Sequence, residues 1–396
     1  MSSYAVELTR TLVRIDSINP PGNEARIISL LKSELERCGF RTTEVPLGPG
    51  RSSLVARAGG EKRVLAFTGH VDTVPLGNRP WSVDPFGGEI IDGRLYGRGS
   101  SDMKSGVAAF IAAAQGFGAR PTGDEGLLLV ITAGEETGCD GARTVTAADG
   151  VLGRADAFLI GEPTANVPLV GHKGALWLEA EVEGVTAHGS MPEQGVNAVV
   201  KAADMVSRLK AFDFHGLRHA VLGLPTLNVG TFHGGLNVNS VPDRALIGLD
   251  LRTLPEQDHA TLRAEMAAFL GPDARLRVLT DLPGLWTAPE DPWVSRVMAF
   301  ARDLAGAPTA PAGVAYFTDG SVLSAALGNP PAVILGPGEP HMAHQTDEYC
   351  RVDRIDEATA LYAAILRDWY GEGRDSESPA NGRAASQAPG EGRNEP

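Results

Sequence analysis

Short apolar runs that alternate with helical segments constrain the fold of this chain more than any other sequence feature. Such runs occupy residues 64–68 (VLAFT), 127–132 (LLLVIT) and 157–160 (AFLI), each bounded by glycine or polar residues. Runs of this length are typical of strands that are buried on both faces. Segments with the character of packed helices precede or separate them, at 4–14, 25–38 and 107–115. The alternation predicts an α/β domain with a mixed, mostly parallel sheet flanked by helices.

The pattern changes near residue 171. Residues 176–183 alternate with a period of two, and the elements after them follow the order helix, strand, strand, helix, strand as far as residue 279. Together they predict a ferredoxin-like α+β unit, with helices on one face of its sheet and a polar opposite face. After Pro283 the α/β pattern resumes. We therefore expect one discontinuous domain, residues 1–172 and 285–370, interrupted by an inserted domain at 173–284.

The end of the chain differs in composition from the rest. Residues 371–396 contain no aromatic, leucine, isoleucine or valine residue. Such a segment cannot bury enough apolar surface to offset the entropy lost on ordering, so we expect a disordered tail.

Charge and cysteine content exclude some classes of protein. The chain has 35 basic and 49 acidic residues and a net charge of −14, which argues against a nucleic-acid or anionic-membrane partner. Its three scattered cysteines, Cys38, Cys139 and Cys350, do not form the framework of a disulfide-rich domain. Neither a signal-peptide pattern nor an apolar run of bilayer length is visible. These features predict a cytoplasmic protein.

Metal-ligating residue types follow each predicted strand of the α/β domain. They are His70 and Asp72, then Glu135 and Glu136, then Glu162, and, after a run at 332–335, His341 and His344. Ligands of open α/β sheets bind beyond the carboxyl ends of the strands, so we expect these side chains to gather there. Crowded carboxylates repel one another unless cations bind between them. Histidine with carboxylate and no thiolate suits Zn²⁺, Co²⁺ or Mn²⁺.

A paired-metal hydrolytic site can be built from these residue types. One carboxylate must bridge two ions, and another must stay free to take a proton from the attacking water. The adjacent Glu135 and Glu136 suit this division, because neighbouring side chains point in different directions. The chain has no Gly-x-Ser-x-Gly elbow, phosphate-binding loop or His-Glu-x-x-His helix, so other hydrolytic or nucleotide chemistries have little support.

Several stretches, in order, resemble the metallopeptidase family that includes acetylornithine deacetylase, succinyl-diaminopimelate desuccinylase, aminoacylase-1 and glutamate carboxypeptidase. They are TGHVDTVP (68–75), GRGSSDMKSG (97–106), TAGEETG (132–138), GEPT (161–164), TAHGSMPEQGVNA (186–198), NSVPD (239–243), DLR (250–252) and AHQTDEY (343–349). The resemblance covers residues 5 to 370. It implies a split catalytic domain, an inserted lid and dimerisation domain, a homodimer and hydrolysis of an amide bond.

The resemblance also assigns roles at the metal site. His70 and Glu162 would ligate one metal, and Glu136 and His344 the other, while Asp102 would bridge both. Asp72 would orient His70, and Glu135 would act as general base and then acid. The peptide bond between Asp102 and Met103 is expected to be cis.

Further roles concern the substrate. By resemblance, His188 would reach the active site of the partner subunit and stabilise the oxyanion of the transition state. Arg252 and Asn239 would hold the substrate carboxylate, and Thr318 and Gly320 would line the pocket. His172, His233 and His341 match no functional residue, and we expect them to be structural or peripheral.

The identity of Glu162 separates branches of the family. Carboxypeptidases and dipeptidases usually have Asp at this position, so Glu162 favours the deacetylases and desuccinylases. The expected function is removal of a short acyl group from an N-acyl amino acid, with N-acetylornithine as the leading substrate and two Zn²⁺ or Co²⁺ ions, or Mn²⁺, as cofactors. The alternatives are a succinyl-diaminopimelate desuccinylase, a carboxypeptidase or dipeptidase, and a non-catalytic metal-binding protein on the same fold.

Overall fold

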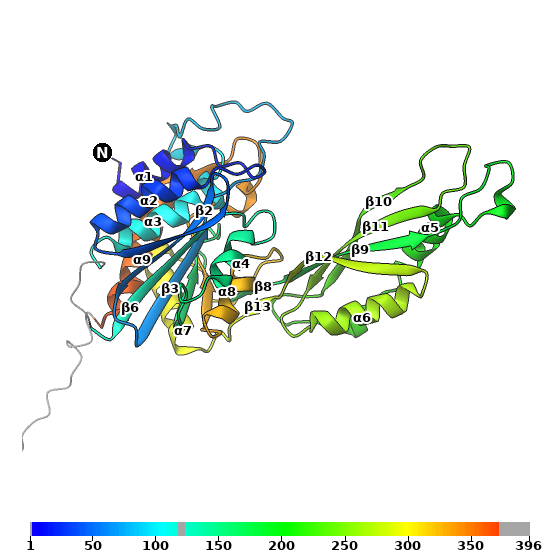
Figure 1. The fold of residues 1–396 in the computed structure, drawn as a ribbon. Helices are drawn as coiled ribbons and strands as arrows, with labels where there is room; N and C mark the ends of the chain where they lie inside the picture. Colours follow the sequence, from blue (N-terminus) through cyan, green and yellow to red (C-terminus); the bar gives the residue numbers. More distant parts are fainter. Residues whose placement is uncertain (1, 118–122, 372–396) are drawn as a thin grey trace, which may run out of the picture.

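The computed structural model describes residues 2–117 and 123–371. They form two lobes, one around a large sheet and one around a smaller sheet that extends away from it (Figure 1). Apart from Gly371, the predicted tail at 371–396 lies outside the described residues. Within the described ranges, no helix combines the length and the apolar character needed to cross a membrane.

The first lobe is built on a six-stranded sheet in the order β1-β2-β6-β3-β7-β14. Its strands are β1 Arg41–Gly48, β2 Arg51–Gly59, β3 Arg63–His70, β6 Glu125–Thr132, β7 Ala157–Ile160 and β14 Ala332–Ile334. The last four in the sheet order are parallel, whereas β2 runs antiparallel to both of its neighbours, β1 and β6. The mixed, mostly parallel sheet expected from the sequence is confirmed.

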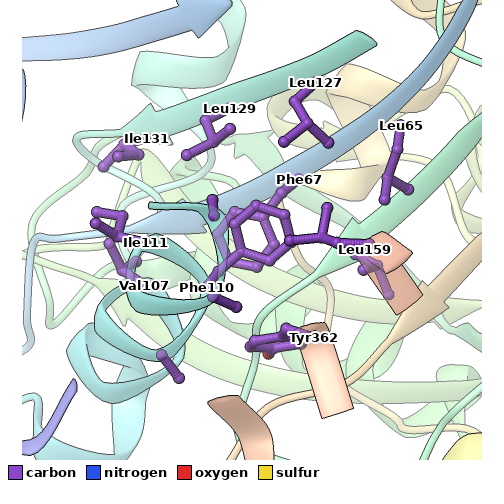
Figure 2. Close-up of a cluster of buried hydrophobic side chains, with 14 of the residues drawn as sticks. Leu65, Phe67, Val107, Phe110, Ile111, Leu127, Leu129, Ile131, Leu159 and Tyr362 are labelled. Atoms are coloured by element: carbon purple, nitrogen blue, oxygen red, sulfur yellow. The ribbon is translucent and has the colours of Figure 1, made fainter. Parts of the chain in front are cut away.

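Both faces of this sheet are buried, which explains the apolar runs. In β3, Leu65 and Phe67 face one core, whereas Val64 and Ala66 face the other. The helices of the first core are α1 Tyr4–Val13, α2 Ala25–Arg37, α3 Ser105–Ala114, α7 Pro292–Ala305 and α9 Val352–Trp369. In Figure 2, Phe67 stacks on Phe110 of α3 with ring centroids 4.0 Å apart. The opposite face is covered by α4 Asp140–Ala147 and α8 Gly320–Ala326.

The second lobe has the predicted ferredoxin-like order. Its elements are β9 Gly174–Glu183, α5 Ala198–Leu209, β10 Thr226–Gly234, β11 Arg244–Thr253, α6 His259–Leu270 and β12 Ala274–Leu282. The sheet order is β10-β11-β9-β12 and every pair is antiparallel. Leu176 and Leu178 of β9 pack with both helices, while Glu179 and Glu181 lie on the opposite, polar face.

The chain enters and leaves the second lobe at one place. The short strand β8, Gly171–His172, pairs antiparallel with β13, Leu285–Trp286. From there β9 runs outward, away from the six-stranded sheet (Figure 1). This pairing supports our proposal that the domain bounds fall at 172/173 and 284/285.

Several elements were not predicted from the sequence. The strand β1 lies at the edge of the sheet and is mostly exposed, so it has no apolar run to reveal it. A small three-stranded sheet joins β4 Ile90–Ile91, β5 Arg94–Tyr96 and β15 Tyr349–Arg351. Strands of two or three residues are too short to show a periodic pattern.

Candidate metal centre and active site

The carboxyl ends of neighbouring parallel strands bring the predicted ligands together. His70 ends β3, Glu135 and Glu136 follow β6, and Glu162 follows β7. Since β6, β3 and β7 are adjacent and parallel, these ends share one edge of the sheet. Strand order, which the sequence does not state, therefore creates the cluster.

The first ligand group consists of His70, Asp102 and Glu162, whose ligand atoms lie within 4.8 Å of one another. Nε2 of His70 is 3.2 Å from Oδ1 of Asp102 and 3.9 Å from Oε2 of Glu162. On the other side of the ring, Nδ1 is 3.0 Å from the backbone carbonyl of Asp72. A carbonyl only accepts hydrogen bonds, so Nδ1 carries a hydrogen, and Nε2 is the ring nitrogen that faces the two carboxylates.

The second group consists of Asp102, Glu136 and His344, again with ligand atoms within 4.8 Å. Nε2 of His344 is 3.0 Å from Oε2 of Glu136 and 3.4 Å from Oδ2 of Asp102. Asp102 thus offers one oxygen to each histidine. The side chain of His344 is 52% exposed, whereas that of His70 is 1% exposed, so the centre opens to solvent on the His344 side.

The electrostatics of the cluster fit a site for cations. Burial raises the pKa of Glu135 well above its usual range, and the nearby Glu162 and Glu136 raise it further. Burial likewise raises the pKa of Glu162, with Asp102 adding to the effect. Hydrogen bonds to Asp102 and Glu136 raise the pKa of His344 to about 10. Neighbouring carboxylates repel one another when all of them are ionised. Two divalent cations bound between these carboxylates and histidines would offset that repulsion.

Asp72 connects two strand ends. Its fully buried carboxylate accepts hydrogen bonds from the backbone N–H groups of Glu135 at 3.1 Å and Glu136 at 3.3 Å. It also accepts a bond of 3.0 Å from Nδ2 of Asn19. Asp72 therefore positions the loop after β6, in addition to its contact with His70. The sequence did not point to Asn19.

A second buried carboxylate, Glu348, holds the loop that carries Asp102. Its oxygens accept bonds from the backbone N–H groups of Gly99, Ser101 and Asp102 at 2.9, 2.8 and 3.0 Å. Arg98 pairs with it at 2.6 Å, and both side chains are buried. The peptide bond after Asp102 is cis, as expected. Glu348 lies in the AHQTDEY stretch, but the sequence alone did not show what it contacts.

A pocket of about 350 Å³ adjoins both ligand groups. It is lined by Glu135 and by every proposed ligand except His70, and its other lining residues are Pro163, Trp177, Arg252, Tyr316, Phe317, Pro340 and Ala343. The predicted substrate residue Arg252 is therefore close to the metal centre of its own chain. Thr318 and Gly320 are buried next to each other and are not among the described lining residues; Tyr316 and Phe317, just before them, are.

His188 and Asn239 lie in a different part of the chain. Both belong to exposed loops beyond the outer end of β9, where Gly189 N–H donates to the Asn239 carbonyl at 2.7 Å. A ten-residue strand separates that end from the first lobe, a length of about 33 Å. Within one chain, the structure does not bring His188 or Asn239 to the metal centre. His172 is buried, and His341 is exposed and close to Tyr349.

Known proteins resemble this chain over nearly its whole length. A succinyl-diaminopimelate desuccinylase from Cereibacter sphaeroides is 33% identical, with 92% of this chain and 98% of the relative covered. An acetylornithine deacetylase from Proteus mirabilis is 31% identical, with 92% and 96% covered. A tripeptidase structure from Staphylococcus aureus is 26% identical, with 93% and 99% covered and a TM-score of 0.72.

A more distant structure shows the same fold. It is an M20 family metallo-carboxypeptidase from Sulfolobus solfataricus, 19% identical, with a TM-score of 0.75 over 93% of this chain and 99% of the other. The sequence model of peptidase family M20/M25/M40 matches residues 66–368. That match spans most of both lobes and all the predicted metal ligands. The chain belongs to peptidase family M20/M25/M40 and is an enzyme that hydrolyses amide bonds.

Proposed function

We propose that this enzyme removes a short acyl group from N-acyl amino acids with the help of two divalent metal ions. The observation that carries the proposal is the position of Asp102, which offers one oxygen to each of two histidine-carboxylate groups. Glu135, which belongs to neither group, lines the pocket beside them. Water would add to the amide, with its hydroxyl going to the acyl carbon and its proton to the departing nitrogen.

The ligand groups define where ions would be held. His70, Asp102 and Glu162 would hold one ion, and Asp102, Glu136 and His344 the other. Bound ions would polarise the amide carbonyl and make water easier to deprotonate near neutral pH. Nitrogen and oxygen donors without sulfur favour Zn²⁺ or Co²⁺, with Mn²⁺ as a third candidate.

Glu135 would move the proton. It belongs to neither ligand group, and it lines the pocket next to both. Its carboxylate would take a proton from the attacking water and then deliver it to the leaving nitrogen. Burial raises the pKa of Glu135, and a group that both accepts and donates a proton works best when its pKa lies near the working pH.

The remaining roles require a second subunit. Arg252 would bind the substrate carboxylate within its own chain, whereas His188 and Asn239 would act in the active site of a partner subunit. Almost fully exposed apolar residues near these loops, Leu236 and Val238, support a homodimer formed through the second lobe. Thr318 and Gly320 would support the pocket from behind Phe317.

A desuccinylase is the second candidate, favoured by the 33% identity to the Cereibacter sphaeroides enzyme.

The three cysteines are free thiols, which supports our placement of the enzyme in the reducing cytoplasm.

Metal-loaded protein should be tested on N-acetyl amino acids, N-succinyl-diaminopimelate and dipeptides. We expect turnover of N-acyl amino acids that stops on chelation and returns with Zn²⁺ or Co²⁺. Turnover of dipeptides alone would favour a peptidase instead. Two bound ions without turnover of any substrate in a broad panel would favour a non-catalytic protein.

A further inference from the structure

One wall of the pocket is aromatic. Trp177 comes from β9, and Tyr316 and Phe317 come from the segment before α8. The rings of Trp177 and Phe317 meet edge to face, with centroids 6.1 Å apart and planes at 70°. All three side chains are only partly buried, so ring surface remains available to a bound molecule.

The polar atoms of this wall already have partners in the protein. Nε1 of Trp177 donates to Oδ1 of Asp250 at 2.9 Å. The hydroxyl of Tyr316 donates to the backbone carbonyl of Pro163 at 3.3 Å. A tyrosine or tryptophan whose polar atom is occupied presents mainly apolar ring surface. The wall is therefore suited to an apolar group of the substrate.

The position of Trp177 in β9 is unusual for its strand. Alternate residues of β9, from Leu176 to Val182, pack against α5 and α6. Trp177 lies on the opposite face, and the next two residues of β9 on that face are Glu179 and Glu181. Packing in the core of the second lobe therefore does not explain this tryptophan, whereas the pocket does.

The charge of the pocket limits the substrate further. Among the described lining residues, Arg252 is the only lysine or arginine. Its guanidinium is 2.9 Å from Asp250 and 5.9 Å from the ring centroids of both Trp177 and Phe317. One substrate carboxylate can pair with this cation. Among the described lining residues, no second lysine or arginine is available to bind a second substrate carboxylate at the aromatic wall, and the guanidinium beside the rings disfavours a substrate ammonium group there.

We propose that the preferred substrates carry one carboxylate and an apolar side chain, as in the N-acetyl derivatives of phenylalanine and leucine. This inference rests on the proposed function. In an amino acid, the carboxylate and the side chain branch from the same carbon, so a carboxylate on Arg252 brings the side chain to Trp177 and Phe317. A pocket of about 350 Å³ is at the small end for ligand sites and suits a single N-acyl amino acid.

The wild-type enzyme, loaded with Zn²⁺ or Co²⁺, should be assayed on the N-acetyl derivatives of phenylalanine, leucine, glycine and ornithine, and on N-succinyl-diaminopimelate. We expect kcat/KM for the phenylalanine and leucine derivatives to exceed that for the ornithine and diaminopimelate derivatives by at least about tenfold. Equal or higher kcat/KM for either charged substrate would overturn the inference and leave the proposed function intact. Failure to hydrolyse every substrate would instead refute the proposed function.

A variant of Phe317 tests whether the aromatic wall is the source of the preference for apolar side chains. Phe317→Ala should lower kcat/KM for N-acetylphenylalanine by about tenfold or more while changing that for N-acetylglycine, which has no side chain, by less than about threefold. Tyr4→Ala, which removes an aromatic ring from the surface of α1, should leave the ratio of the two substrates unchanged. An equal loss on both substrates in the Phe317 variant would contradict the contact between this ring and the substrate side chain.

Discussion

Glu135 and Glu136 are adjacent in the chain but differ in their surroundings. Glu136 bonds to His344 and belongs to a ligand group, whereas Glu135 lines the pocket outside both groups. The backbone N–H groups of both residues bond to Asp72, which holds the turn in place. The division of roles that we propose for these residues thus has a structural basis in one buried aspartate.

Replacement of Glu135 tests that division. We expect Glu135→Gln to lower kcat by about 10²–10⁴-fold, because the amide cannot take a proton from water. Metal content should stay at two ions per chain, measured by elemental analysis. Glu125→Gln, at the other end of the same strand, is the control and should keep its activity. Loss of metal from the Glu135 variant would show instead that this residue is a ligand.

Glu348 is expected to act on the metals through Asp102. In Glu348→Gln, one oxygen becomes an NH₂ group that must face Arg98 or backbone N–H groups, all of which are donors. We expect metal affinity to fall by about 10–100-fold, measured by competition with a chromogenic chelator.

A matched control separates the effect of Glu348 on metal binding from the effect that loss of any buried glutamate–arginine pair has on folding stability. Glu24 is also a buried glutamate paired with an arginine, Arg51, at 2.6 Å. Glu24→Gln should lower the free energy of unfolding without lowering metal affinity. If Glu348→Gln binds metal as tightly as the wild type, the loop does not depend on this carboxylate.

At the scale of secondary structure, the buried parallel strands were the most predictable elements and the antiparallel strands β1 and β2 the least. Strands β3, β6 and β7 are buried on both faces, so their apolar runs predicted them to within a few residues. Strands β1 and β2 form an antiparallel extension of the sheet, and β1 is mostly exposed and polar. An exposed edge strand such as β1 depends on hydrogen bonds to its neighbour rather than on an apolar pattern, so the local sequence does not reveal it. The other edge strand, β14, is buried, and its apolar run did predict it.

The short strand β8 carries a buried histidine that is expected to affect stability at acid pH. Nδ1 of His172 donates to the Lys173 carbonyl at 2.9 Å, and Nε2 is buried without a hydrogen-bond partner. Burial lowers the pKa of His172 to about 4. Between pH 6.5 and 4 the unfolded chain therefore binds a proton that the folded chain does not. The free energy of unfolding should fall over this range as pH falls, by up to about 3 kcal/mol from this group.

Chemical denaturation at several pH values measures this effect. His172→Asn keeps a side-chain N–H donor but does not titrate, so stability should depend less steeply on pH between 6.5 and 4. His215→Asn, at an exposed position, serves as the control and should keep the wild-type slope. An unchanged slope in the His172 variant would mean that His172 is charged in the folded protein.

At the scale of the whole molecule, the two lobes divide the predicted substrate residues into two sets. Arg252 lies at the inner end of β11, paired with Ala175 of β9, and lines the pocket. His188 and Asn239 lie beyond the outer end of β9. A homodimer that places the second lobe of one subunit over the first lobe of the other would reunite the two sets.

Mixed dimers test this arrangement. His188→Ala and Glu135→Gln should each be nearly inactive alone. Co-expressed with different tags, they should form mixed dimers in which the His188→Ala subunit keeps Glu135 and receives His188 from its partner. Random pairing would restore about one quarter of wild-type activity, since about half of the dimers are mixed and each has one complete site. No recovery in purified mixed dimers, or full activity of a monomer in sedimentation experiments, would contradict a shared site.

The sequence by itself determined the secondary structure of most buried elements, β2 being an exception, together with the two-lobed order of strands and helices and the residue types available as ligands. These follow from local periodicity and from the residues that end each strand, and both are readable in one stretch of chain. The same local reading predicted the helical and polar faces of the second lobe.

Only the tertiary structure decided which of these residues meet. The order β6-β3-β7-β14 and the position of the loop that carries Asp102 bring the oxygens of one carboxylate to two histidines. Contacts between segments far apart in the chain also produce three further features. These are the hydrogen bonds from the Asp102 loop to Glu348, the aromatic wall of the pocket, and the separation of His188 from Arg252. Such contacts are set by the packing of whole elements against one another, which no local pattern of residues encodes.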